Sequence, residues 1–287
     1  MAILLTGGTG KTSTRIAQQC LDANTPFVIA SRKGQSGVAE DMHGTKFDWL
    51  DPSTFQNPFQ HKFPNGEKID TVYLVAPDSG DLGSIINPFI DICKEKGVKK
   101  FVYFTGSTCE NGSGFGGEVW NKLHEIGEEY TVLRATWFMD NFIHWNHGNT
   151  IKNENKINSA CGDGKIPFIS ANDIARMAFT VLTKPMKLEN SYRLIGPELL
   201  TFDQCADILT RVLGRKIIHV KLSQQESFEK YMQEGGHSET MAKLLSNVEV
   251  WSSYGSESFE GDDVQKVTGQ EPEHFEKWVG DNRGAWE

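Results

Sequence analysis

The chain has 287 residues and a formal net charge of −9 at pH 7. That length accommodates one doubly wound domain and a smaller appendage, and the negative field disfavours nucleic acid and anionic membranes as partners. No apolar run reaches the ~18 residues that cross a bilayer, and no secretory signal is expected at the start. The five cysteines have no CxxC spacing, so we expect free thiols, a cytoplasmic location and no bound metal.

The most informative stretch is the beginning of the chain, where a short apolar strand at residues 2–5 runs into a glycine-rich turn and then a helix. Such a helix N-terminus presents unpaired N–H groups and the positive end of the helix dipole, which favours a phosphate. The spacing Gly7-x-x-Gly10-x-x-Ser13 is that of a variant dinucleotide turn. A P-loop would need a glycine where this chain has Leu5, and an ordinary strand-to-helix turn is the other alternative.

The choice between NAD and NADP depends on the end of the second predicted strand, residues 26–30. An NAD site needs an acidic residue about 20 positions after the turn, where it binds the ribose hydroxyls. Here Ser31, Arg32 and Lys33 follow the strand, and a hydroxyl with two cations suits the extra phosphate of NADP(H). The alternative is a solvated basic turn. Asp48 is expected at the end of the third strand, near the adenine.

Strand and helix patterns alternate along the first half of the chain. Apolar runs at residues 70–77, 100–107 and 130–136 predict buried strands, and residues 85–96 and 120–126 predict helices between them. This alternation predicts an α/β fold with a Rossmann-like doubly wound parallel sheet.

The pattern loosens after residue 145, where the cluster His144, Trp145 and His147 predicts a mobile loop beside the pocket. Further along, residues 171–183 predict a helix and residues 191–195 a strand that rejoins the sheet. Another helix is expected over residues 200–214, with Thr201 as N-cap and Gly214 as the stop, followed by a helical tail from residue 224.

These elements predict two parts. Residues 1–145, joined by 171–197, form the NADP-binding domain, and residues 146–170 with 198–287 form a smaller, mostly helical substrate-binding part. The candidate cofactor-binding residues lie in the glycine turn and at the ends of the predicted strands. They are Gly7, Thr9, Gly10, Lys11, Thr12, Ser31, Arg32, Lys33, Asp48, Ala76, Pro77 and Thr105.

Several further segments carry a family signature, namely residues 105–107, 132–141, 162–175, 196–203 and 208–220. With the glycine turn they resemble the NmrA-like branch of the atypical short-chain dehydrogenases, and within it the fungal ergot-alkaloid reductases. The resemblance implies NADPH-dependent reduction of a cyclic iminium, made from an indole-bearing amine and an aldehyde, in fungal indole-alkaloid biosynthesis. The chain departs from that pattern at Ala135, which replaces a proline, and over residues 112–122, which are expected over the nicotinamide.

The chemistry of an iminium explains a missing catalytic dyad. Ordinary short-chain dehydrogenases protonate an alkoxide with Tyr-x-x-x-Lys, whereas the corresponding spacing here is Glu118-x-x-x-Lys122. Reduction of C=N⁺ yields a neutral amine, so orientation, an aromatic wall and a carboxylate for the cation suffice. The candidate catalytic residues are Glu118, Lys122, Asp140 and Ser107, and the candidate substrate-binding residues are Trp120, Trp137, Phe138 and Met139.

Each of these residues also has a structural interpretation. Trp137 and Phe138 can be core residues, Asp140 can cap the next segment, and Glu118 and Lys122 can be solvated helix residues.

Three functions therefore stay open. The first is the iminium reductase, acting on a small cationic indole alkaloid as a monomer or homodimer. The second is an NADP(H)-binding cyclase that directs a Pictet–Spengler-type ring closure of amine with aldehyde, with Glu118 or Asp140 as acid–base residue. The third is a non-catalytic NADP-sensing regulator with a protein partner.

Overall fold

The computed structural model of the protein describes residues 1–78, 81–184, 189–233 and 237–287. The chain divides into two compact units. The first comprises Met1–Arg134 and Ile174–Arg193, and the second comprises Ala135–Asp173 and Leu194–Glu287. No helix in the described ranges is both long and apolar enough to cross a membrane.

The first unit is built on a seven-stranded sheet in the order β3-β2-β1-β4-β5-β6-β8, which confirms the doubly wound α/β prediction. Four neighbouring pairs, from β3 through β5, are parallel. The strands are β1 (Ala2–Leu5), β2 (Phe27–Ser31), β3 (Gly44–Lys46), β4 (Ile69–Val75), β5 (Lys100–Gly106), β6 (Glu129–Ala135) and β8 (Ser191–Leu194). The returning strand predicted over residues 191–195 is therefore present.

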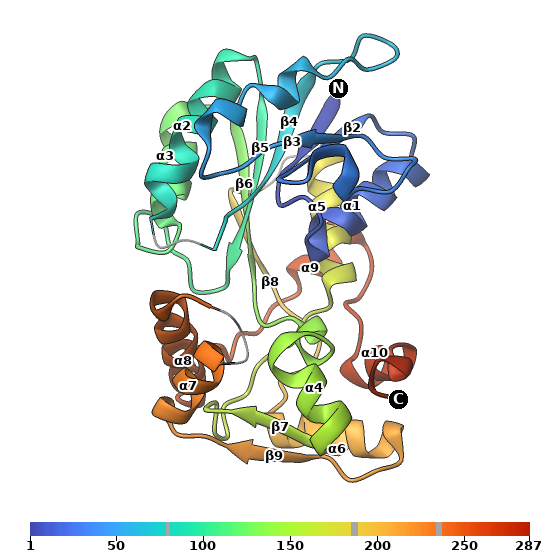
Figure 1. Cartoon of the computed structure of the whole chain (residues 1–287), viewed down its shortest axis with the longest axis vertical. Helices are drawn as coiled ribbons and strands as arrows, with labels where there is room; N and C mark the ends of the chain where they lie inside the picture. Colours follow the sequence, from blue (N-terminus) through green and yellow to red (C-terminus); the bar gives the residue numbers. More distant parts are fainter. Residues whose placement is uncertain (79–80, 185–188, 234–236) are drawn as a thin grey trace. The chain divides into compact units, whose positions relative to one another are not determined.

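Helices cover both faces of this sheet. In Figure 1, α2 (Leu82–Glu95) and α3 (Gly117–Ile126) lie together on one face, and α1 (Lys11–Asp22) and α5 (Ala171–Thr183) lie on the other. All four residues of β1 are buried, as expected for a strand covered on both sides. The core beneath α2 contains a cluster of aromatic rings, including Phe47, Trp49, Phe55 and Phe89.

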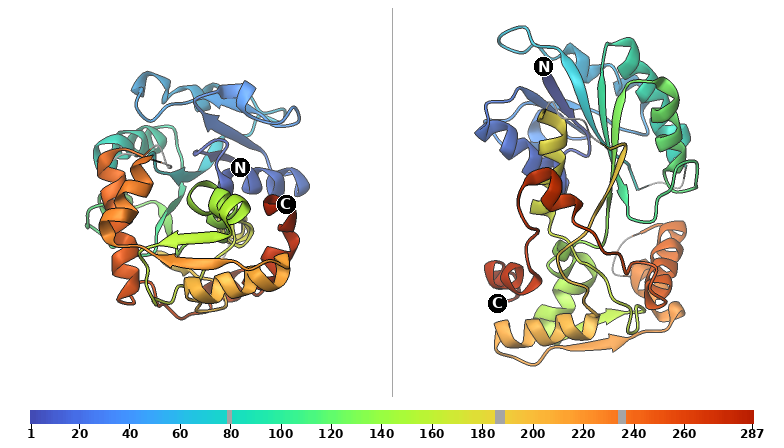
Figure 2. Two further views of the ribbon diagram at one scale, coloured as in Figure 1. Left: turned by 60° about the horizontal axis from the view of Figure 1, so that its bottom comes forward. Right: turned by 180° about the vertical axis from the view of Figure 1, so that it is seen from behind.

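The second unit is mostly helical around one short parallel pair, β7 (Lys156–Ser159) and β9 (Ile218–Lys221), which run side by side in Figure 2. Its α-helices are α4 (Trp145–Glu154), α6 (Phe202–Leu213), α7 (Gln224–Gln233), α8 (Glu239–Ser253), α9 (Asp263–Thr268) and α10 (Phe275–Asp281). The predicted ends of α6 are confirmed, because Thr201 forms a capping box with Gln204 and Gly214 closes the helix in the left-handed conformation. The loop predicted around residues 144–147 is wrong, since α4 begins there.

A buried carboxylate joins α7, α8 and the strand pair within this unit. Glu249 is fully buried and accepts hydrogen bonds from the amide of Ala160 (2.9 Å), the phenol of Tyr231 (2.8 Å) and the hydroxyl of Ser227. The ammonium group of Lys230 lies 3.3 Å from the same carboxylate. Because every partner is present, the buried charge is compensated and fixes the two helices.

His147 is the buried histidine of α4, and its Nδ1 has no hydrogen-bond partner among the described residues. Its ring lies 5.4 Å from the rings of both Phe142 and Phe202. Burial lowers the pKa of His147 well below its ordinary value, and the nearby Lys230 and His219 lower this pKa further. The folded protein therefore holds His147 neutral.

We expect acid to destabilise the second unit through His147. Below about pH 6.5 the imidazole takes up a proton in the unfolded chain but not in the folded one, so stability falls by about 1.4 kcal/mol per pH unit until the folded pKa is reached. His147→Phe removes this dependence and preserves the packing. Urea unfolding at pH 7.5, 6.5 and 5.5 measures the pH dependence of the unfolding free energy. The control is a variant in which the exposed His43 is replaced by Phe. Equal pH slopes in wild type and His147→Phe would contradict the assignment.

Candidate functional site

The turn after β1 has a conformation that only glycine adopts comfortably at two positions. Gly7 has φ +76° and Gly8 has φ +45°. A Cβ on Gly7 would lie 2.8 Å from Cβ of Val75, and one on Gly8 would lie 2.4 Å from Cβ of Ser31. The backbone of the turn thus lies directly against β2 and β4, with no room for side chains.

The first turn of α1 contributes no compensating group of its own to the positive end of the helix. Gly10 is the N-cap, without a side-chain hydrogen bond, and the first turn contains no acidic residue. Ser13 is buried and donates to the carbonyl of Thr6 (2.7 Å), so this small residue serves the close packing of α1 on β1. Thr12 is also buried, and its hydroxyl accepts from the phenol of Tyr73 (3.2 Å). The Thr12 side chain is thus engaged within the first unit, and the backbone amides of the first turn are the groups that this helix would offer to a phosphate.

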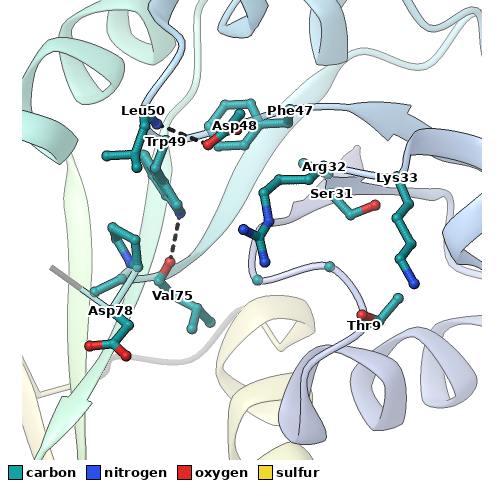
Figure 3. A pocket seen from close by; sticks show the side chains of 15 residues that line it. Thr9, Ser31, Arg32, Lys33, Phe47, Asp48, Trp49, Leu50, Val75 and Asp78 are labelled. Carbon is teal, nitrogen blue, oxygen red and sulfur yellow. Dashed lines mark hydrogen bonds between the residues drawn. The ribbon is translucent and has the colours of Figure 1, made fainter. Parts of the chain in front are cut away.

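A cavity of about 620 Å³ lies at the carboxyl ends of β1, β2, β3 and β4, inside the first unit (Figure 3). Its lining includes eight of the predicted cofactor-binding residues, namely Gly7, Thr9, Ser31, Arg32, Lys33, Asp48, Ala76 and Pro77. Gly10, Lys11, Thr12 and Thr105 are not among the lining residues. The cavity has the size and the position that a doubly wound sheet provides for a dinucleotide.

The side chains of Arg32 and Lys33 extend from the end of β2 beside the glycine turn (Figure 3). Both residues are exposed, and within the described ranges no carboxylate lies within 4.0 Å of either cation. The hydroxyl oxygen of Ser31 is buried and has no hydrogen-bond partner among the same residues. Two uncompensated cations and an unsatisfied hydroxyl donor fit a phosphate group, which supplies the missing negative charge and acceptors.

The segment after β3 completes the cavity opposite the cations. Asp48 accepts a hydrogen bond from the amide of Leu50 (3.0 Å), and the indole nitrogen of Trp49 donates to the carbonyl of Val75 (3.1 Å). These bonds fix the segment and leave the Leu50 side chain 72% exposed. The Leu50 side chain could pack against the flat face of an adenine, and the Asp48 carboxylate could accept a hydrogen bond from its amino group. Leu50 is not among the residues predicted from the sequence, because no local pattern distinguishes it.

The predicted catalytic residues of the first unit have unequal surroundings. Glu118 is exposed in the first turn of α3 and accepts from the amide of Gly116 (3.3 Å). Lys122 forms an ion pair with Asp91 (2.6 Å), and Ser107 is buried after β5. Of these three side chains, Glu118 is the exposed carboxylate.

Trp120 was predicted as part of a substrate wall. It is 8% exposed and belongs to the core between the sheet and helices α2 and α3. The guanidinium of Arg134 lies 5.3 Å from the centre of its ring. A structural role therefore accounts for the burial of Trp120.

The other predicted substrate residues belong to the second unit. Trp137 and Phe138 are half-buried, whereas Met139 is buried in the core of that unit. Asp140 is also buried, and its carboxylate accepts from the amide of Ala171 (2.8 Å) at the start of α5. This contact gives the Asp140 carboxylate a structural partner at α5, 31 positions along the chain, and not in the next segment, for which a cap was predicted. The described residues contain no group of three or more His, Cys, Asp or Glu side chains arranged to hold a metal ion.

Residues 67–279 match the sequence profile of the NmrA-like family. The chain belongs to this family. Its relatives include the agroclavine dehydrogenase of Claviceps fusiformis, which is 42% identical over 289 residues, covering 100% of this chain and 99% of the relative. The festuclavine dehydrogenase of Aspergillus fumigatus is 38% identical over 292 residues, with the same coverage of both chains.

Solved structures share the NmrA-like fold. The triphenylmethane reductase of Citrobacter sp., solved in complex with NADP(H), superposes with a TM-score of 0.80 at 23% identity, covering 97% of this chain and 99% of that one. At this identity the likeness concerns the fold alone. The resemblance to NmrA-like proteins and to alkaloid dehydrogenases that the sequence suggested is confirmed by the relatives.

Proposed function

We propose that this NmrA-like protein is an NADPH-dependent reductase that transfers hydride to the carbon of a cyclic, indole-bearing iminium. The observation that carries the proposal is the pair Arg32 and Lys33 beside the hydroxyl of Ser31. Among the described residues, neither cation has a carboxylate within 4.0 Å and the Ser31 hydroxyl has no hydrogen-bond partner. The relatives whose names describe dehydrogenases of agroclavine and festuclavine support the alkaloid substrate class.

The glycine turn and the first amides of α1 would hold the pyrophosphate, and Ser31, Arg32 and Lys33 would hold the phosphate on the adenosine ribose. When bound, NADPH supplies a hydride, and the C=N π electrons become the lone pair of a neutral amine. No proton has to be delivered in that step. The pairing of Lys122 with Asp91 is compatible with this chemistry, because no general acid is required of the lysine. The exposed carboxylate of Glu118 is the group we assign to balancing the substrate charge.

The test combines the purified protein with NADPH and a 3,4-dihydro-β-carbolinium salt, and it follows both absorbance at 340 nm and the amine product. We expect one NADPH consumed per amine formed, and much slower turnover with NADH. If the protein binds NADPH tightly but consumes none with any indole-bearing iminium, the proposal is contradicted. Ring closure of an amine and an aldehyde with oxidised cofactor present would instead identify a cyclase.

A further inference from the structure

Phe115, in the loop between β5 and α3, has an unusual backbone for an aromatic residue. Its φ is +61°, in the left-handed region. Only two other non-glycine residues in the described ranges have positive φ, and both are asparagines, Asn24 and Asn155. Asparagine tolerates this conformation, whereas a bulky side chain is strained in it. The Phe115 side chain is nevertheless 54% exposed, so core packing does not explain the strain.

The neighbouring glycines show why the backbone takes this path. Gly116 has φ +102°, and a Cβ there would lie 2.2 Å from the phenol oxygen of Tyr103 on β5. A Cβ on Gly117 would lie 2.1 Å from the carbonyl oxygen of Glu110. The chain therefore packs tightly against the Tyr103 phenol and against the start of its own loop at Glu110, and glycine is required at both positions. Phe115 immediately precedes them, although its own conformation would also favour glycine or asparagine.

The rest of the loop is firmly anchored. The hydroxyl of Ser113 donates to the carbonyl of Glu110 (2.6 Å). The Glu110 carboxylate lies 2.8 Å from the guanidinium of Arg134, at the end of β6, and 3.7 Å from that of Arg193 on β8. Arg134 also donates to the hydroxyl of Ser191 (2.9 Å). These hydrogen bonds and ion pairs hold the loop in one conformation and can maintain a strained residue within it. Strained residues of this kind concentrate at ligand sites.

The loop also follows the strand at which the reactive end of the cofactor is expected. The described cavity extends along the carboxyl ends of β3, β2, β1 and β4, with the Arg32 and Lys33 cations at its β2 side. A dinucleotide whose adenosine phosphate meets these cations crosses the glycine turn and continues toward β4 and β5. Phe115 belongs to the connection that leaves β5.

We propose that Phe115 is a specificity-determining residue, whose exposed ring packs against the aromatic, positively charged ring system of the substrate. This inference rests on the proposed function. The face of a phenyl ring carries negative electrostatic potential that attracts an iminium, and its apolar area packs against an indole. A small aliphatic iminium presents much less area to the same ring.

The decisive variant is Phe115→Asn, because asparagine accepts the left-handed backbone and removes only the aromatic ring. We expect kcat/KM for the dihydro-β-carbolinium to fall about tenfold, mainly through KM, and kcat/KM for N-methyl-1-pyrrolinium to change less than about twofold. Phe115→Trp, which keeps an aromatic ring, is expected to retain the preference. The Kd for NADPH and the thermal midpoint of Phe115→Asn verify that the cofactor site and the fold are preserved.

Calorimetric titration of the carbolinium onto the NADP⁺-bound protein separates this inference from the proposed function. If the wild type binds the compound without reducing it, the function fails, and weaker binding by Phe115→Asn still supports the role of Phe115. If the wild type reduces it and Phe115→Asn shows unchanged selectivity, or loses both substrates equally, the role of Phe115 is overturned alone. A wild type that binds no iminium overturns both.

Discussion

Replacing Arg32 and Lys33 together with alanine is expected to weaken NADPH binding by about 100-fold and to leave NADH binding nearly unchanged. Each charge-assisted contact to a phosphate contributes about 1.5–3 kcal/mol, so the loss of two contacts corresponds to at least about 3 kcal/mol. NADH lacks the phosphate that these cations would bind. The protein would then lose its cofactor preference while keeping its fold, because both side chains are exposed.

Fluorescence titration with each nucleotide at 50 and 250 mM NaCl measures this change. Salt should weaken NADPH binding by the wild type more than by the double variant, since the variant has lost the screened interaction. Arg211→Ala is the matched control, because Arg211 is an exposed arginine of the second unit, paired with Glu276. If the double variant lost affinity for NADH and NADPH equally, the cations would have no selective role.

Gly7→Ala is expected to abolish tight binding of both nucleotides, with a loss of affinity of about 100-fold or more. Two costs combine at this position. Alanine in a left-handed conformation costs about 1–2 kcal/mol, and the new Cβ would lie 2.8 Å from Cβ of Val75. The turn has to move away from β4, and its amides then no longer point at one phosphate.

Gly66→Ala provides an unusually close control for Gly7→Ala. Gly66 has φ +77°, almost the value of +76° at Gly7, but a Cβ there would meet nothing within 4 Å. This variant should lose about 1–2 kcal/mol of unfolding free energy and retain nucleotide affinity. Urea unfolding and nucleotide titration of both variants make the comparison. Equal nucleotide affinities of the two variants would show that contact with β4 is unimportant.

Local sequence predicted those parts of the molecule that depend on local chemistry. The turn after β1 was predictable from an apolar strand, the spacing from Gly7 to Ser13 and the helical pattern after it. All three features lie within a few residues and favour the same strand-to-helix geometry. The sequence Ser31-Arg32-Lys33 indicated the cationic side of the cavity, since residues at the carboxyl end of β2 must reach the edge where the turn lies. The ends of α6 were predictable from Thr201 and Gly214 for the same reason.

Features that depend on distant partners were not predictable. Residues 145–159 are rich in Asn, and their sequence shows no clear period, yet they form α4 and β7. The pairing of β7 with β9 arises from residues about 60 positions apart. In the same way, nothing near Lys122 reveals Asp91, and nothing near Asp140 reveals Ala171. Long-range contacts thus changed the environment of both candidate residues.

The divided path of the chain has a consequence for biosynthesis. Strand β8, which borders β6 in the seven-stranded sheet, comes from residues 191–194, after the first segment of the second unit. While the ribosome is still synthesising that segment, β6 has an open edge that can pair with another nascent chain. The sheet of the first unit therefore cannot be completed in order from the N-terminus. A fragment that ends at Arg134 would lack β8 and would keep the edge of β6 unpaired.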